Sequence, residues 1–152
     1  MRREHFLLLA AGALLAAASR PAPAKDLAEP VNKDRQGVAL SGYDPVAYFR
    51  ETRPVKGSEK FTHSYMGATW RFASAENRDL FAAIPENYAP QFGGFCSWAV
   101  SHNYTAEIDP EAWKIVEGKL YLNYNKKVQK MWEEDLYKYI GDGNRNWPGL
   151  HR

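Results

Sequence analysis

Cysteine is almost absent from this sequence of 152 residues, in which Cys96 is the single thiol. One cysteine cannot form an internal disulfide, and this excludes a disulfide-stapled scaffold. The roles left open for the thiol are an inert buried side chain, a ligand, or a link to a second chain.

An excess of one charge is also absent. The chain has 20 lysines and arginines against 18 aspartates and glutamates. Residues 1–24 contain three arginines and one glutamate, so the remainder has 17 residues of each sign. A neutral domain has no electrostatic reason to bind nucleic acid or an anionic membrane. We therefore expect no nucleic-acid partner.

No hydrophobic run is long enough to span a bilayer as a stable anchor. The longest is Phe6–Ala18, 13 residues with Gly12 inside it. It follows a positively charged start and precedes Ala22-Pro23-Ala24, as in a secretory signal peptide with a small-residue cleavage site. We predict a signal peptide over residues 1–24 and a periplasmic or secreted protein without a membrane anchor. An uncleaved anchor is the alternative, and Arg2-Arg3 leaves twin-arginine and general export both open.

Strong catalytic motifs are missing as well. The sequence has no phosphate-binding glycine loop, no His-Glu-x-x-His, no Cys-x-x-Cys and no Gly-x-Ser-x-Gly. Composition and motifs therefore do not favour an enzyme. No internal repeat is evident either.

The patterns that are present predict an α+β fold, a single small domain with two β-hairpins and three or four short helices. Residues 25–36 are polar and predict a linker, followed by the domain over residues 37–152. Phe61–Tyr65 alternates in polarity and leads through Met66-Gly67-Ala68 to a return strand, which predicts the first hairpin. Glu117-Gly118 joins the strands of the second.

Helix starts are marked by capping residues. Asp44-Pro45 and Ser74 each predict a helix N-terminus, and Asn125 predicts the start of a longer helix that ends at Gly141. The helix after Ser74 is expected to bury Leu80, Phe81 and Ile84. A short helix is expected to begin near Cys96.

Four side chains are candidate metal ligands: Cys96, His63, His102 and Met66. Thiolate and imidazole suit copper or zinc, and a thioether suits copper(I). Cys96 and His102 lie six residues apart, on different faces of a helix, so they could chelate together only if the helix ends between them. The alternative is that these side chains have structural roles only.

Aromatic residues suggest a second kind of site. An apolar ligand cavity with Asp44 as a polar anchor could be lined by Tyr43, Tyr48, Trp70, Phe72, Phe92, Phe95 and Trp98. The same rings could instead form the core of a small domain. A third reading takes Cys96 as a nucleophile activated by a helix start, with His63 or His102 as its base.

Several motifs together resemble the YHS family, and specifically an exported bacterial type. They are Gly42-Tyr43-Asp44-Pro45-Val46-Ala47-Tyr48-Phe49, His63-Ser64-Tyr65, Thr69-Trp70-Arg71-Phe72-Ala73-Ser74-Ala75-Glu76-Asn77 and Tyr88-Ala89-Pro90-Gln91-Phe92-Gly93-Gly94-Phe95-Cys96. YHS modules also occur in copper-transporting ATPases, so the resemblance implies metal binding. The positions where the family often carries paired cysteines are Ala73 and Asn77 here.

Three hypotheses follow. The first is a periplasmic YHS-domain protein that binds copper or another transition metal through Cys96 with His63 or His102. The second is a binding module for a small molecule or a partner protein, without a metal. The third is a thiol-based redox enzyme.

Overall fold

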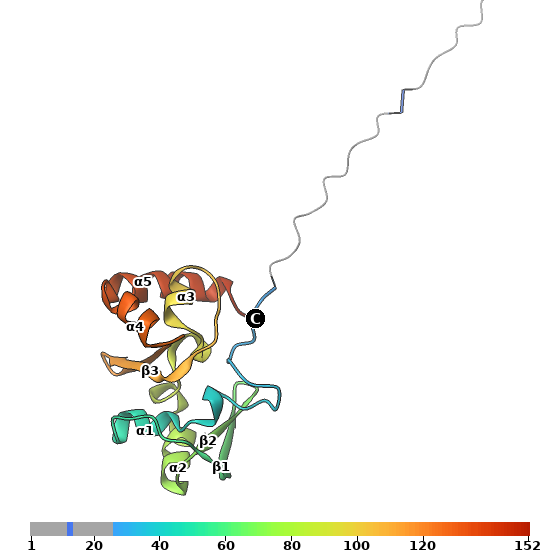
Figure 1. Cartoon of the computed structure of the whole chain (residues 1–152). Coiled ribbons are helices and arrows are strands. Elements are labelled where there is room, and N and C mark those ends of the chain that lie inside the picture. The colour runs from blue at the N-terminus through green and yellow to red at the C-terminus, as the bar shows by residue number, and fades with distance from the viewer. Residues whose placement is uncertain (1–11, 14–25) are drawn as a thin grey trace, which may run out of the picture.

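The computed structural model describes residues 12–13 and 26–152, so the predicted signal peptide falls almost wholly outside the described residues. The α+β fold class is confirmed, with two antiparallel two-stranded hairpins and short helices in one domain (Figure 1). None of the helices in the described part of the chain has the length and hydrophobicity of a membrane span.

The first hairpin consists of β1 (Ser58–Tyr65) and β2 (Ala68–Phe72). Its turn residues Met66 and Gly67 have φ of 49° and 75°, and two consecutive positive φ values favour glycine in a two-residue hairpin turn. The chain then enters α2 (Ala75–Ala83), where Ser74 Oγ accepts a hydrogen bond from Asn77 N at 3.1 Å. This cap closes the helix start as predicted.

Helix α1 (Pro45–Arg50) precedes this hairpin and follows a 3-10 turn, η1 (Leu40–Gly42). Asp44 caps α1, with Oδ1 accepting from Val46 N at 2.8 Å and from Ala47 N at 3.3 Å. We call residues 40–83 the first unit.

Residues 92–133 repeat the same order of elements, and we call them the second unit. A 3-10 turn, η3 (Gln91–Gly94), leads to α3 (Ser97–Ser101), β3 (Asp109–Val116), β4 (Lys119–Asn123) and α4 (Lys126–Glu133). Figure 1 shows the first unit as the lower part of the molecule and the second unit in the upper part. A short turn, η2 (Pro85–Asn87), lies in the connection.

The C-terminal helix predicted from Asn125 to Gly141 is two helices. α4 ends at Glu133, and α5 (Leu136–Asn146) runs on to the turn η4 (Trp147–Gly149). Glu133, Glu134 and Asp135 are consecutive acidic residues, which are unfavourable at the negative end of a helix. This acidic run gives a physical reason for the break.

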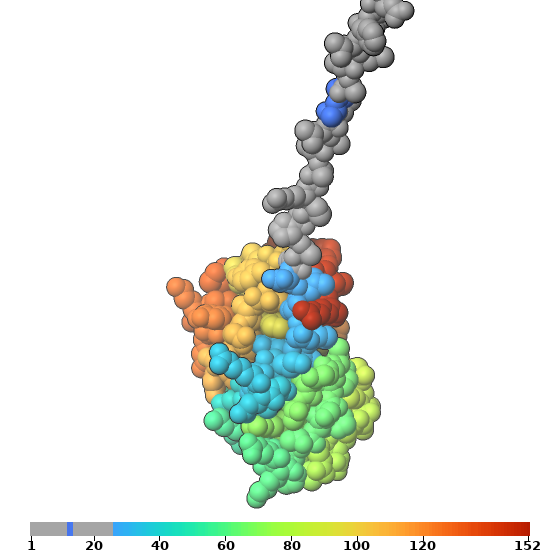
Figure 2. Space-filling model, turned by 90° about the vertical axis from the view of Figure 1, so that its right-hand side faces the viewer, coloured from blue at the N-terminus to red at the C-terminus, as the bar shows by residue number. Residues whose placement is uncertain are grey.

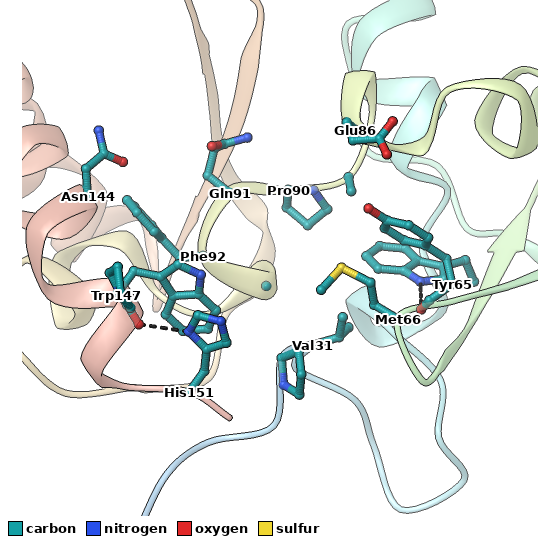
Figure 3. Close-up of a pocket in the computed structure, with 15 residues that line it drawn as sticks. Val31, Tyr65, Met66, Glu86, Pro90, Gln91, Phe92, Asn144, Trp147 and His151 are labelled. Atoms are coloured by element: carbon teal, nitrogen blue, oxygen red, sulfur yellow. Dashed lines mark hydrogen bonds between the residues drawn. The ribbon is translucent and has the colours of Figure 1, made fainter.

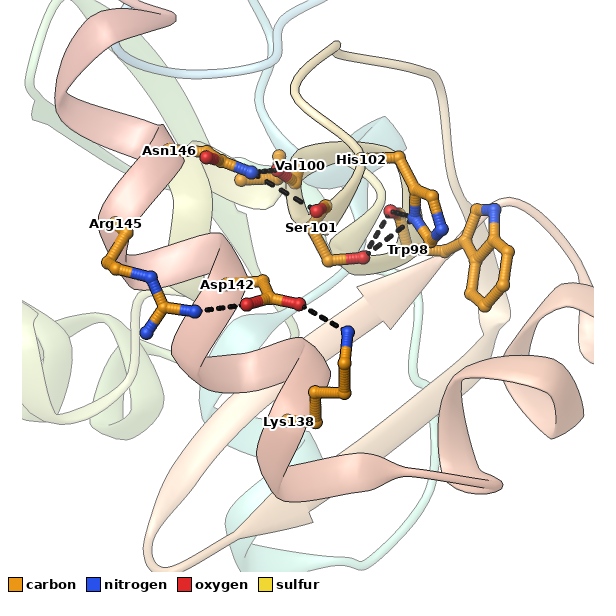
Figure 4. A network of polar contacts seen from close by, with 8 residues as sticks. All are labelled: Trp98, Val100, Ser101, His102, Lys138, Asp142, Arg145 and Asn146. Atoms are coloured by element: carbon orange, nitrogen blue, oxygen red, sulfur yellow. Dashed lines mark hydrogen bonds and ion pairs between the residues drawn. The ribbon is translucent and has the colours of Figure 1, made fainter.

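Helix α5 packs against α3, as Figure 4 shows. Asn146 Nδ2 donates to the carbonyl oxygens of Val100 and Ser101 at 3.0 and 3.1 Å. On the outer face of α5, Asp142 pairs with Lys138 at 2.9 Å and with Arg145. The hydrogen bond from Lys138 is the main cause that lowers the pKa of Asp142.

Residues 26–36, expected to form a linker, lie against the domain. Ala28 pairs with His151 beside the C-terminus, and Asn32 N donates to Gly93 O at 2.8 Å. Val31 is buried at 4% exposure. Figure 2 shows this blue and cyan segment crossing the face between the two units. Backbone hydrogen bonds and the side chains of Asn32 and Lys33 hold it in place, which hydrophobic patterning does not reveal. We call residues 26–36 the N-terminal strap.

The two units share one interior. The buried cluster around Trp70 and Phe81 also includes Leu120 and Leu122 of β4, and Tyr48 meets Trp113 with ring centroids 5.3 Å apart. Within α2, Phe81 is fully buried as predicted. Ile84 is 50% exposed, so its prediction as a buried residue was wrong, because α2 ends before it.

Candidate functional site

Cys96 lies at the junction of η3 and α3 and is 1% exposed. Its Sγ accepts a hydrogen bond from Tyr124 N at 3.2 Å and lies 3.7 Å from Asn123 Oδ1. Burial raises the pKa of the Cys96 thiol, against the opposing effect of nearby backbone N–H groups of Ala99, Tyr124 and Trp98. The sulfur is therefore a buried thiol that stays protonated at neutral pH, which makes it a poor nucleophile.

His63 lies on β1, opposite Trp70 in the hairpin register. Its ring meets Phe81 edge to face, with centroids 6.1 Å apart. His63 therefore faces an aromatic part of the first unit. The partly buried ring of His63 packs at the edge of the cluster around Trp70 and Phe81.

His102 ends α3 and folds back onto the ring of Trp98, with centroids 4.1 Å apart. Its Nδ1 lies 2.8 Å from Trp98 O and 2.9 Å from Ser101 Oγ (Figure 4). The carbonyl can only accept, so Nδ1 carries the proton in this contact. These bonds anchor His102 to its own helix end.

The structure does not assemble Cys96, His63 and His102 into one site. Within the described residues, no three His, Cys, Asp or Glu side chains are grouped so that they could hold a metal ion. Met66, the fourth candidate ligand, is 52% exposed at the tip of the first hairpin.

Ala73 and Asn77, at the positions where the YHS family often carries cysteines, surround the buried carboxylate of Asp44. Asp44 Oδ2 accepts from Ala73 N and from Asn77 Nδ2, each at 2.8 Å. Asn77 Oδ1 in turn accepts from Arg50, which pairs with Glu76. At this place in the first unit, hydrogen bonds connect Asp44 at the start of α1 with Ala73 and Asn77 at the start of α2.

A groove lies on another face, between the tip of the first hairpin and the C-terminal turn (Figure 3). Its volume is about 290 Å³. Phe92, Trp147 and His151 form one side, and Tyr65 and Met66 form the other. Trp70, whose Nε1 donates to Tyr65 O at 3.1 Å, also belongs to the lining. Pro30 and Val31 of the N-terminal strap and Pro90 complete the lining. Such a groove can receive a flat ring between two sets of aromatic side chains.

Polar groups occur at both sides of this groove. On the hairpin side, burial raises the pKa of Tyr65, and the negative charge of Glu86 raises it further. The Tyr65 hydroxyl therefore stays protonated near the Glu86 carboxylate. On the opposite side, His151 stacks on Trp147 with centroids 4.1 Å apart and an interplanar angle of 14°. His151 Nδ1 lies 2.8 Å from Trp147 O, which leaves Nε2 as the acceptor of the neutral ring.

The groove overlaps only in part with the aromatic cavity proposed from sequence. Trp70 and Phe92 line it, whereas Tyr48 and Phe72 are fully buried in the core and Asp44 is a helix cap. The sequence analysis missed Trp147 and His151 as lining residues. Their spacing of four residues in a short turn could have indicated a stacked pair, but not what they would face.

Comparison with known families gives one match. Residues 46–92 match the YHS domain. This match supports the YHS family for the chain. The matched YHS segment begins in α1 and ends at Phe92, so it covers most of the first unit and stops close to the start of the second. Searches of curated proteins and of solved structures found no match.

Proposed function

We propose that this YHS-domain protein is a non-enzymatic binding module that holds a small, ring-containing organic molecule in the groove between the first hairpin and the C-terminal turn. The observation that supports this most is a groove of about 290 Å³ with the aromatic side chains of Tyr65 and Trp147 in its lining. The nearly buried rings of Trp70 and Phe92 also border it. Ligand sites in proteins are concave and mostly apolar with a few polar groups, and this groove is at the small end of their range.

The polar group of the ligand is proposed to be a cation or a hydrogen-bond donor. Glu86 supplies a carboxylate to the groove lining, next to the Tyr65 hydroxyl. Aromatic faces attract a cation through the negative potential of their π systems, and the carboxylate adds a direct charge partner. An aromatic amine combines both features.

A titration with tryptamine and its neutral analogue tryptophol tests this proposal. Trp147→Ala should weaken the binding of both probes about tenfold, because one stacking ring is lost. Glu86→Gln should weaken tryptamine several-fold and leave tryptophol unchanged. Glu134→Gln is the matched control, because Glu134 is exposed on the far end of α4.

Two results would count against the groove. One is tryptamine binding that Trp147→Ala leaves unchanged. The other is an equal change in the affinities of tryptamine and tryptophol in Glu86→Gln. That result would show that the groove does not select a cationic ligand through Glu86. Isothermal titration calorimetry measures both affinities.

Transition-metal binding, with copper first, is the second proposal, and the YHS match is the observation that favours it. A copper(I) titration of wild type and Cys96→Ser separates the two. We expect the same stoichiometry and affinity in both proteins, because the sulfur is sealed at 1% exposure. Loss of one copper equivalent in the variant would instead make Cys96 a ligand.

We further propose that the protein acts after export, in the periplasm or outside the cell. The proposal rests on the signal-peptide pattern of residues 1–24.

A further inference from the structure

We propose that the two units are diverged copies of one ancestral unit, and that Cys96 occupies in the second copy the N-cap position that Asp44 occupies in the first, where its sulfur fixes the end of the second hairpin. The inference is independent of the groove. The thiol of Cys96 then has a structural role that requires neither chemical reactivity nor a bound metal.

The strands of the two hairpins agree in length, spacing and register. β1 begins at Ser58 and β3 at Asp109, 51 residues later, and both strands have eight residues. β2 and β4 have five residues each and are displaced by the same 51 positions. Both hairpins have an irregularity in pairing at the same place, between Ser58 and Thr62 and between Asp109 and Trp113. Independent hairpins have no reason to share a bulge position.

The turns and the helices that follow agree with this displacement. Glu117 and Gly118 have φ of 51° and 76°, against 49° and 75° for Met66 and Gly67. Asn125 caps α4 through Val128 N as Ser74 caps α2 through Asn77 N, again 51 positions apart. Each hairpin packs an inward ring on a helix ring. In the first unit the ring centroids of Trp70 and Phe81 are 5.2 Å apart. In the second unit those of Tyr121 and Trp132 are 5.4 Å apart.

The segments before the hairpins match with a displacement of 52. Three consecutive residues with positive φ open each unit, at 55°, 53° and 79° in the first and 57°, 61° and 80° in the second. They are Leu40, Ser41 and Gly42, and Phe92, Gly93 and Gly94. Such a run is strained for non-glycine residues, so its recurrence at the same place is strong support for common origin.

Cys96 falls at the equivalent of Asp44 by this displacement. Asp44 Oδ2 accepts from Ala73 N, the residue after β2, and Cys96 Sγ accepts from Tyr124 N, the residue after β4. Ala73 and Tyr124 are 51 positions apart. The side chain at each cap therefore ties the start of the first helix to the end of the hairpin.

The two N-cap residues differ in one respect, because the Cys96 side chain makes no cap hydrogen bond to α3 whereas the Asp44 side chain caps α1. Asp44 Oδ1 accepts from both Val46 N and Ala47 N at the start of α1. In the second copy, Trp98 N donates instead to Asn123 Oδ1 at 3.0 Å. One weak acceptor at Cys96 is then sufficient, and no buried charge is required.

Sequence similarity between the copies is almost lost. Between residues 58–83 and 109–134, Gly67 and Gly118 are the one identical pair, at the turn where positive φ is needed. This explains why no repeat is evident in the sequence and why the YHS match covers the first copy alone.

Amide hydrogen exchange measured by NMR tests the shared cap. In Cys96→Ser, the Tyr124 amide should keep its protection, because the hydroxyl oxygen is still an acceptor. In Cys96→Ala and Cys96→Val, the exchange rate of the Tyr124 amide should rise relative to wild type. This rise should be roughly tenfold larger than the average change in exchange rate at the other core amides. Asp44→Asn leaves one acceptor oxygen where two are used, so either the Ala73 amide or the Val46 and Ala47 amides should exchange faster.

Two variants without an acceptor are used because alanine leaves a cavity and valine fills it, so at least one folded variant is expected. Val100→Ala, a buried truncation in the same helix, is the control and should change all core amides together. An unchanged exchange rate of the Tyr124 amide in Cys96→Ala or Cys96→Val would overturn the role of Cys96 as the acceptor for that amide. A copper(I) equivalent lost in Cys96→Ser would also overturn it.

Discussion

At the scale of single residues, the main feature is a pair of buried caps with different chemistry. Asp44 is a fully buried carboxylate held by N–H donors from α1, from the residue after β2 and from Asn77. Cys96 is a neutral thiol in the equivalent place. Asp44, Ser74 and Asn125 could be identified as caps from sequence because a cap depends on residues within one turn. The role of Cys96 depends on Tyr124, 28 residues away, and could not.

The raised pKa of Cys96 predicts an effect of alkaline pH on stability. The folded chain keeps the thiol protonated to higher pH than the unfolded chain, so the unfolded state loses this proton first. The free energy of unfolding should then fall above the ordinary thiol pKa of about 8.5, by up to roughly 1.4 kcal/mol per pH unit. Chemical denaturation at neutral and alkaline pH measures this loss.

Cys96→Ser separates the thiol from other groups in that experiment. Burial also raises the pKa of Tyr65 and Tyr121, so both proteins should lose some stability at high pH. The loss should be larger in wild type than in the serine variant. Parallel curves for the two proteins would mean that the thiol titrates alike in the folded and unfolded chains.

At the scale of elements, the two hairpins could be predicted because alternation and a glycine turn are local signals. The N-terminal strap could not, since it is held by backbone contacts to residues far along the chain, such as Asn32 N to Gly93 O. The break between α4 and α5 was missed because apolar spacing continues across it. Half of the groove depends on the strap and the C-terminal turn, so its position was equally out of reach of sequence patterns.

Gly93 tests how tightly the strap is held. A Cβ at Gly93 would lie 2.1 Å from Pro30 O, and the residue has φ of +61°. Gly118 also has positive φ, at +76°, but a Cβ there meets nothing within 4 Å. Gly118→Ala should cost about 1–2 kcal/mol through backbone strain. Gly93→Ala should cost more than about 3 kcal/mol, because the strap must also move.

Urea denaturation of the two glycine variants gives both free energies of unfolding. Equal losses would show that the strap yields to the new methyl group at little cost. Because Pro30 also lines the groove, Gly93→Ala should weaken tryptamine binding as well, whereas Gly118→Ala should not.

At the scale of the whole molecule, the groove is a property of the assembled chain and not of one unit. Tyr65 and Trp70 come from the first unit, Phe92 from the start of the second, and Trp147 and His151 from the C-terminal turn. The YHS match ends at Phe92, so it includes one side of the groove and little of the other. Ligand binding is therefore expected to depend on how the two units pack together.

The most direct measurement of this account is an NMR titration of the protein with tryptamine, followed through the backbone and indole N–H signals. We predict saturable shifts at Tyr65, Met66 and Trp147, with the signals of Glu117 and Gly118 at the far hairpin tip unchanged. The absence of saturable shifts at up to about 10 mM tryptamine, or shifts centred away from the groove, would contradict the account.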